Sequence, residues 1–156
     1  YKNGDMEAFK ANAEAFDALI SDMDTLLATR KEFLLGVWLE SAKAMGTTPE
    51  ESALYEQNAR NLLGTWGNKD CKLFDYACKQ WSGMMNGYYR QRWNLFFEDV
   101  LANWGHFEQN DFAQKCKDYE WNWIFETDCF PTEKSGDEIE VVKSLWNKYN
   151  TTLLNE

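Results

Sequence analysis

The sequence predicts an all-α fold, a bundle of about six or seven antiparallel helices. Apolar residues recur at helical spacings of three and four along most of the 156 residues. No segment alternates apolar and polar residues as a half-buried strand would. The two prolines, Pro49 and Pro131, both fall at joints between periodic segments. No linker or internal repeat divides the chain, so residues 1–156 are expected to form one domain.

The first two helices are expected over residues 5–29 and 30–45. Acidic residues crowd the start of the first, where the helix dipole favours them. Its apolar positions form one stripe, which should face a core: Phe9, Ala13, Phe16, Ile20, Met23 and Leu27.

The third helix carries local start and stop signals. Thr48 suits the N-cap, Pro49 the first helical position, and Glu51 the partner position of a capping box. Gly64 follows the last periodic residue and marks the end.

Four further helices are expected over residues 75–87, 88–104, 110–125 and 138–154. A bend is expected at Asn86-Gly87, between the first two of these. The intervening segments 65–72 and 127–137 are polar or contain Gly and Pro, which is typical of loops.

The charge of the chain disfavours two classes of partner. Its 26 acidic and 16 basic residues give a net charge of −10, with no basic cluster to hold a phosphate backbone or an anionic membrane. No apolar run reaches the roughly 18 residues of a membrane span. We therefore expect neither nucleic acid nor membrane as a partner. The chain begins at Tyr1 without an initiator Met or a signal peptide, which indicates a fragment of a longer protein.

The four cysteines leave two readings open. None of them forms a CxxC pair, so no zinc site is predicted. They are either free thiols, or they form one or two disulfides such as Cys71–Cys78 or Cys116–Cys129 in an oxidising compartment.

No catalytic constellation stands out. A glycosidase needs two carboxylates flanking the scissile bond, but Glu98-Asp99 and Glu138/Glu140 occur where solvated helix faces would place them. His106 is the only histidine, and no Gly-rich phosphate loop occurs. We therefore predict no catalytic residue, no metal site and no cofactor in this chain.

A binding site is the remaining possibility, because aromatic and polar residues concentrate between Asn58 and Trp93. Trp faces stack on sugar rings, and Asn, Arg and Asp donate or accept hydrogen bonds to hydroxyls. Trp66 lies in a Gly-flanked polar loop with no helix face to fill, so it is the leading candidate. The alternative for the others is core packing at helical spacing: Tyr76, Trp81, Tyr88 and Trp93.

Five motifs in order resemble one known family. They are FLLGVWLESAK (33–43), YEQNAR (55–60), TWG (65–67), DYACKQWSG (75–83) and YYRQRWNLFFE (88–98), followed by an ending like the family's last helix. This order resembles the C-terminal helical domain of the α-N-acetylglucosaminidases, glycoside hydrolase family 89. The segment Asn68–Cys71 and Cys78 depart from the family pattern.

The resemblance implies a C-terminal all-helical domain of a larger, exo-acting, retaining enzyme that hydrolyses terminal α-linked N-acetylglucosamine. It implies that both catalytic glutamates lie on a (β/α)8 barrel of the same polypeptide, and that this chain packs on the barrel and closes one wall of the sugar pocket. Trp66 carries over as pocket-lining, while Arg60, Asp75 and Tyr76 carry over only as neighbours of its loop. The parent enzyme is expected to be exported, to a bacterial periplasm or cell surface, or to be lysosomal or secreted in a eukaryote.

The alternative to an enzyme domain is a free-standing helical module that binds carbohydrate or protein. If a barrel partner is missing, its docking face should be an exposed apolar patch, through which the isolated domain can self-associate.

Overall fold

The computed structural model describes residues 1–72, 75 and 77–153, and it is all-α as the sequence predicts. A 3-10 turn, η1 (Lys31–Phe33), precedes the helix α2 (Leu35–Lys43), and a π-helical turn, η2 (Met85–Tyr89), runs directly into the helix α4 (Arg90–Ala102). The described residues form six α-helices: α1 (Met6–Leu27), α2 (Leu35–Lys43), α3 (Pro49–Leu63), α4 (Arg90–Ala102), α5 (Gln109–Trp123) and α6 (Glu138–Leu153).

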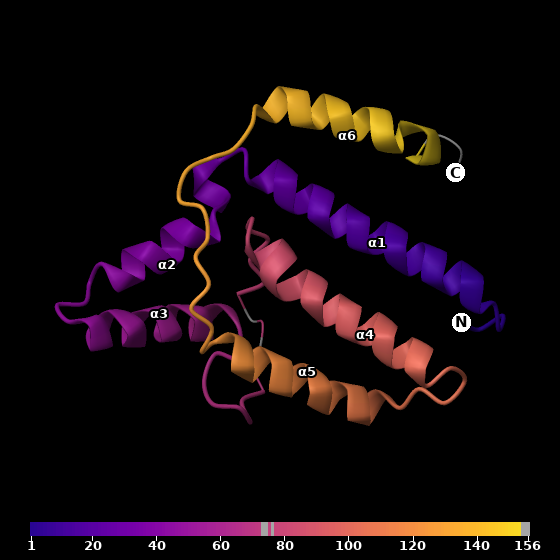
Figure 1. Cartoon of the computed structure of the whole chain (residues 1–156), viewed down its shortest axis with the longest axis horizontal. Coiled ribbons are helices and arrows are strands. Elements are labelled where there is room, and N and C mark those ends of the chain that lie inside the picture. Colours follow the sequence, from indigo (N-terminus) through magenta and orange to yellow (C-terminus); the bar gives the residue numbers. More distant parts are fainter. Residues whose placement is uncertain (73–74, 76, 154–156) are drawn as a thin grey trace.

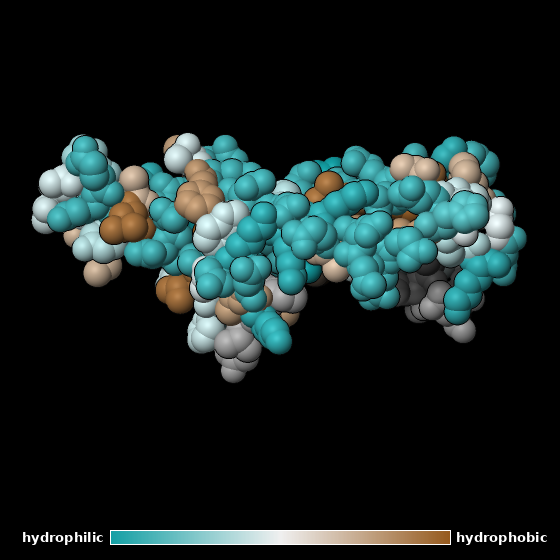
Figure 2. Space-filling view, turned by 90° about the horizontal axis from the view of Figure 1, so that it is seen from below, coloured by the Kyte–Doolittle hydropathy of each residue, from teal (hydrophilic) through white to brown (hydrophobic). Residues whose placement is uncertain are grey.

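Four of the helices lie side by side in a single layer, in the order α6, α1, α4, α5 (Figure 1). The helices α2 and α3 form a hairpin at one end of this layer. The molecule is long and shallow when seen from below, and that edge is mostly hydrophilic (Figure 2). Because these helices lie in one layer, α6, α1 and α4 each have two broad sides that no other helix of the described residues covers.

Local capping signals are confirmed where the sequence carries them. The Thr48 hydroxyl accepts a hydrogen bond from the Glu51 N–H at 3.2 Å, and Pro49 is the first residue of α3. The Glu51 carboxylate accepts in return from the Thr47 hydroxyl at 2.6 Å and from the Thr47 N–H at 2.7 Å, and these two bonds, the hydroxyl first, hold the pKa of Glu51 below its usual range. The start of α1 is capped by Asp5, whose carboxylate accepts from the Ala8 N–H at 2.9 Å.

The prediction of a helix over residues 75–87 is wrong for Asp75 and for residues 77–83. Asp75 and Cys78 have positive φ angles of 56° and 45°, which interrupt a right-handed helix. Ser82 is held in a bridge with the start of α2, because its N–H donates to the Phe33 carbonyl at 2.8 Å and its carbonyl accepts from Leu35 at 3.0 Å. Helical structure begins only at Met84, and η2 contains the predicted bend position.

A distant carboxylate supplies the cap that this helix start lacks locally. The buried Asp24 of α1 accepts hydrogen bonds from the Gly83 N–H at 2.7 Å and the Asn86 N–H at 3.1 Å. Its second oxygen accepts from the Ser82 hydroxyl at 2.9 Å. Asp24 therefore does for this helix what an N-cap side chain does for its own.

The core lies where the α2–α3 hairpin meets η2 and the end of α5. It is crossed by the predicted loop 127–137, which runs so close to α2 that a Cβ on Gly36 would lie 2.3 Å from the Pro131 carbonyl oxygen. The buried core residues are Leu35, Leu39, Ala59, Leu63, Met84, Tyr88, Trp123 and Ile124.

The predictions about core packing are confirmed for some residues and wrong for others. Tyr88 is fully buried and Trp81 packs against the core, as expected. Trp93 is wrong as a core residue, since it is 43% exposed. The α1 stripe is only partly covered, because Ile20 is buried whereas Phe16 and Met23 remain more than a third exposed.

Candidate functional site

The loop that carries Trp66 is organised by one side chain of α3. The Asn61 amide oxygen accepts from the Gly67 N–H at 2.8 Å and from the Thr65 hydroxyl at 2.9 Å. The Asn61 amide nitrogen donates to the Gly67 carbonyl at 3.0 Å, and its backbone carbonyl accepts from the Trp66 N–H at 2.8 Å. Four hydrogen bonds to one residue therefore fix this turn.

Trp66 itself is held in an unusual conformation with its side chain outward. Its φ angle is 57°, in the left-handed region that costs a bulky L-residue on the order of 1–2 kcal/mol. Its side chain is 41% exposed. A strained aromatic residue that is presented to the surface by a clamped loop is typical of a binding site.

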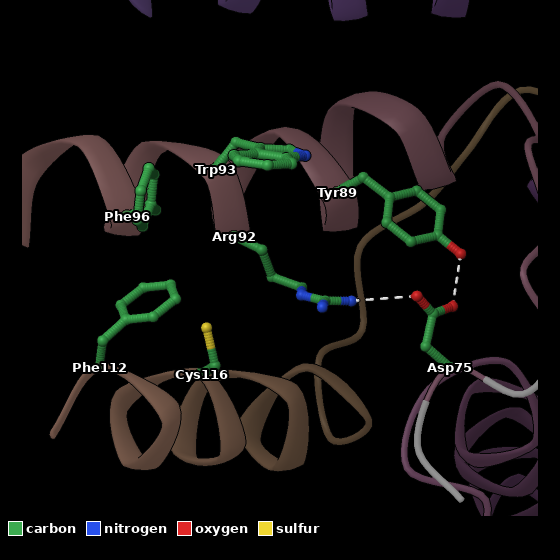
Figure 3. A pocket seen from close by; sticks show the side chains of 7 residues that line it. All are labelled: Asp75, Tyr89, Arg92, Trp93, Phe96, Phe112 and Cys116. Carbon is green, nitrogen blue, oxygen red and sulfur yellow. Dashed lines mark hydrogen bonds and ion pairs between the residues drawn. The ribbon is translucent and has the colours of Figure 1, made fainter. Parts of the chain in front are cut away.

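Asp75 ties the far end of this loop to η2 and α4. Its backbone N–H donates to the Gly64 carbonyl at 2.6 Å, and its own φ is positive. Its carboxylate accepts from the Tyr89 hydroxyl at 2.6 Å and pairs with Arg92 at 3.2 Å (Figure 3). Burial, and then the hydrogen bond to Asp75, raise the pKa of Tyr89 far above its usual value.

A pocket of ≈ 460 Å³ opens beside this network, between α4 and α5. Arg92 lies at its polar end and also pairs with the buried Glu120 of α5 at 3.1 Å. The other walls are mostly aromatic (Figure 3), and the pocket is lined by Asp75, Tyr89, Arg92, Trp93, Phe96, Phe112 and Cys116. Aromatic walls with a few polar groups at one end suit a ligand, or a partner side chain, that is partly apolar.

Arg60 does not join this pocket. It is fully buried, where its guanidinium bonds to Glu56 at 3.1 Å and to the Asp128 carbonyl at 3.0 Å. It also stacks over the Trp123 ring at 5.0 Å. Arg60 therefore anchors the end of α3, just before the Trp66 loop, from inside the core.

The remaining predicted site residue, Tyr76, lies outside the described residues. Trp66 and Asp75 lie near the two ends of the segment that follows α3, and Arg60 is buried in the last turn of that helix. Sequence reasoning missed the α5 side of the pocket, which consists of Phe112 and Cys116, and it missed Glu120, which pairs with Arg92. The spacing of four residues between Phe112, Cys116 and Glu120 predicts that they share one side of a helix, but it does not predict which element packs against that side.

The buried carboxylates of the described residues all have structural partners. Asp24 caps the helix at Met84, Glu56 pairs with Arg60, and Glu120 pairs with Arg92. Asp99 pairs with Lys115. Among the described residues there is no group of His, Cys, Asp or Glu that could hold a metal ion.

Cys78, Cys116 and Cys129 are free thiols, so neither disulfide considered from the sequence is present, and burial raises the pKa of Cys116. No helix in the described part of the chain has the length and apolar character needed to cross a membrane.

Residues 1–148 match the family described as the alpha-N-acetylglucosaminidase C-terminal domain. A human alpha-N-acetylglucosaminidase is 35% identical over 134 residues, which is 84% of this chain and 18% of that protein. The fold is also similar to a family 89 glycoside hydrolase from Clostridium perfringens. Its complex with PUGNAc matches with a TM-score of 0.84 and 32% identity, over 100% of this chain and 19% of that one.

A second structure of the Clostridium perfringens enzyme holds its substrate, GlcNAc-alpha-1,4-galactose, in a variant with two glutamate-to-glutamine substitutions. It matches with a TM-score of 0.78 and 30% identity, over 94% of this chain and 18% of that one. The chain thus spans less than a fifth of the length of these relatives.

Proposed function

Because the chain belongs to the family of alpha-N-acetylglucosaminidase C-terminal domains, we propose that it is the helical domain of an exo-acting, retaining α-N-acetylglucosaminidase. The enzyme would hydrolyse terminal α-linked N-acetylglucosamine. The helical domain would pack on a catalytic (β/α)8 barrel of the same polypeptide and close one wall of the sugar pocket.

The relatives support this substrate class. The human relative is an alpha-N-acetylglucosaminidase, and the Clostridium perfringens relative binds a disaccharide that begins with α-linked GlcNAc. This chain corresponds to a small part of each, which leaves ample length for a barrel.

The observation that carries the proposed role is the presentation of Trp66. An indole that is 41% exposed, on a loop clamped by Asn61, offers a flat apolar face to the C–H face of a sugar ring. Because these hydrogen bonds already order the loop, sugar binding costs little further conformational entropy.

Hydrolysis is assigned to residues outside this chain. A retaining glycosidase places two carboxyl groups about 5–5.5 Å apart around the scissile bond. The buried carboxylates here serve instead as a helix cap or as ion-pair partners, which supports a structural and pocket-closing role.

The test uses the full-length polypeptide that contains this chain, with an aryl α-N-acetylglucosaminide as substrate. We expect hydrolysis, and we expect Trp66→Ala to lower kcat/KM by about 2- to 13-fold, the loss of one aromatic contact. Phe125→Ala is the matched control, because Phe125 is similarly exposed on another part of the surface. Equal values for the wild type and Trp66→Ala would remove Trp66 from the sugar pocket.

A complete failure of the full-length polypeptide to hydrolyse the substrate would reject the enzyme assignment. The coding sequence upstream of Tyr1 gives an independent check. A barrel-sized reading frame with a leader supports an exported enzyme, whereas a start codon immediately before Tyr1 supports a free-standing binding module.

A further inference from the structure

The outer helix α6 carries an apolar stripe that no described residue covers. Ile139, Val142 and Trp146 are spaced by three and four residues, so they share one side of the helix. They are 58%, 49% and 54% exposed. A different side of α6 faces α1, where Lys148 and Tyr149 each reach the Asp22 carboxylate at 2.5 Å.

The neighbouring helix α1 carries a matching stripe of Phe16, Leu19 and Met23, each between 36% and 39% exposed. This stripe lies between the two edges of α1 that contact other helices. On one edge Asp17 pairs with Arg90 of α4 at 2.6 Å, and on the other edge Asp22 meets α6.

The two stripes lie on the same side of the layer. Each residue turns about 100° around a helix, and α6 runs antiparallel to α1 (Figure 1). On each helix the stripe lies about 90° from the α1–α6 contact, in the same sense of rotation along the sequence. Because the two helices are antiparallel, the two stripes therefore face the same side of the layer. Trp93 of α4 extends this side, because its ring lies 4.9 Å from that of Phe16.

We call this side the apolar face: Phe16, Leu19 and Met23 of α1, Trp93 of α4, and Ile139, Val142 and Trp146 of α6. The opposite side of the layer has a different composition. There α1 presents Glu7, Lys10, Glu14, Ser21 and Thr25, and α6 presents Glu140, Ser144 and Asn147. The layer is thus amphipathic as a whole.

We infer that the apolar face is the surface on which the remainder of the same polypeptide docks, an inference that rests on the proposed function. Domains normally bury apolar helix stripes between two layers, and residues 1–72, 75 and 77–153 supply no second layer over α6, α1 and α4. The relatives supply the occupant, because the matched segment is only 18% to 19% of their length. The seven residues that define the face are apolar, so we expect the surface that docks on them to be largely apolar as well.

The shape of the apolar face also suits docking of a protein surface. Trp93 stands between two hollows: a pocket of ≈ 230 Å³ that it lines with Phe16 on the α1 side, and the ≈ 460 Å³ pocket on the α5 side. Hollows of this size on both sides of a ridge accept apolar side chains from a facing surface. The second hollow contains Asp75, so the apolar face continues to the base of the Trp66 loop.

The experiment measures thiol accessibility in the full-length polypeptide. Met23→Cys and Val142→Cys probe the apolar face, while Glu14→Cys and Ser144→Cys probe the opposite side of the same two helices. Brief maleimide pulses followed by peptide mass spectrometry give a rate at each position, and the wild type gives the background of the native thiols. We expect the two apolar-face positions to react at least about tenfold more slowly than their controls, as interdomain burial requires.

Equal labelling rates at Val142→Cys and Ser144→Cys, and at Met23→Cys and Glu14→Cys, would overturn the inference. So would protection that disappears on dilution together with a fall in mass by light scattering, because the occupant would then be a second copy. Hydrolysis of the aryl substrate is measured on the same preparations. Protection without hydrolysis leaves the docking face in place and rejects the enzyme assignment, and hydrolysis without protection does the reverse.

Discussion

The Asn61 amide oxygen accepts a hydrogen bond from the Gly67 N–H at 2.8 Å, and the Asn61 amide nitrogen donates to the Gly67 carbonyl at 3.0 Å. This pair closes the turn on both sides of Trp66. The side chain of Asn61 thus sets the position of the Trp66 indole, although both of these hydrogen bonds go to the backbone of the next residue, Gly67. Asn61 is accordingly a positioning residue for the proposed sugar contact.

Asn61→Ala should lower kcat/KM of the full-length enzyme, because the released turn no longer holds the indole in place. The loss should not exceed that of Trp66→Ala. In a double-mutant cycle, Asn61→Ala should cost little further in the Trp66→Ala background, since both changes act through one contact. Fully additive losses would contradict a role for Asn61 through Trp66.

Trp66→Gly and Trp66→Ala should differ in stability although both lose the indole. The φ angle of 57° is strained for Ala and permitted for Gly. The free energy of unfolding of Trp66→Gly should therefore be higher by about 1 kcal/mol, measured by urea denaturation. Equal kcat/KM values for the two variants would show that this difference concerns the backbone only.

Asp24→Ala should be among the most destabilising single changes in α1. It removes the acceptor for three donors, Ser82, Gly83 and Asn86, in a buried position. We expect a loss of about 3 kcal/mol or more in the free energy of unfolding. The control is Glu7→Ala, because the exposed pair of Glu7 with Lys10 should be worth under about 1 kcal/mol.

Asp17 should make the stability of the fold depend on pH in the acid range. Arg90 bonds to both of its oxygens at 2.6 Å and holds the pKa of Asp17 below its usual 3.8. The unfolded state therefore takes up a proton at a higher pH than the folded state does. The stabilisation is present above the usual pKa and is lost as pH falls through the lower, folded one.

The comparison is between Asp17→Asn and the wild type in urea denaturation from about pH 6 to about pH 2. The two should differ by on the order of 1 kcal/mol or less near neutral pH, because the pair is partly exposed. That difference should shrink towards pH 2. A constant difference over the whole range would exclude Asp17 as a source of the acid sensitivity.

Structural features are predictable from the sequence where the residues that determine them lie within one helical turn of each other. Thr48, Pro49 and Glu51 start α3 by contacts among themselves, so their spacing is sufficient information. Sequence reasoning failed for Asp75 and residues 77–83, where periodic apolar residues suggest a helix. The cap of the true helix start comes from Asp24, 59 residues earlier than Gly83, and no local pattern encodes that contact.

The candidate site shows the same division. Trp66 was identified because Gly and polar neighbours mark its loop, whereas the depth of Arg60 depends on Trp123 and Asp128, which only the fold brings near. Trp93 and Met23 have helical spacing, which predicts core positions, but both are more than a third exposed. Helical periodicity predicts that one side of a helix is apolar and needs to be buried. It does not predict whether the residues that bury it belong to this chain segment or to another part of the polypeptide.

The cap from Asp24 also has a consequence for the order in which the chain folds. A helix start whose donors are satisfied by its own neighbours can form early, while the start at Met84 gains its acceptor only after α1 has docked. A peptide spanning residues 84–102 should therefore fray at its first turn in isolation. During refolding, amide protection of Asn86 should arise with the pairing of α1 and α4, later than protection within α3, whose cap is local.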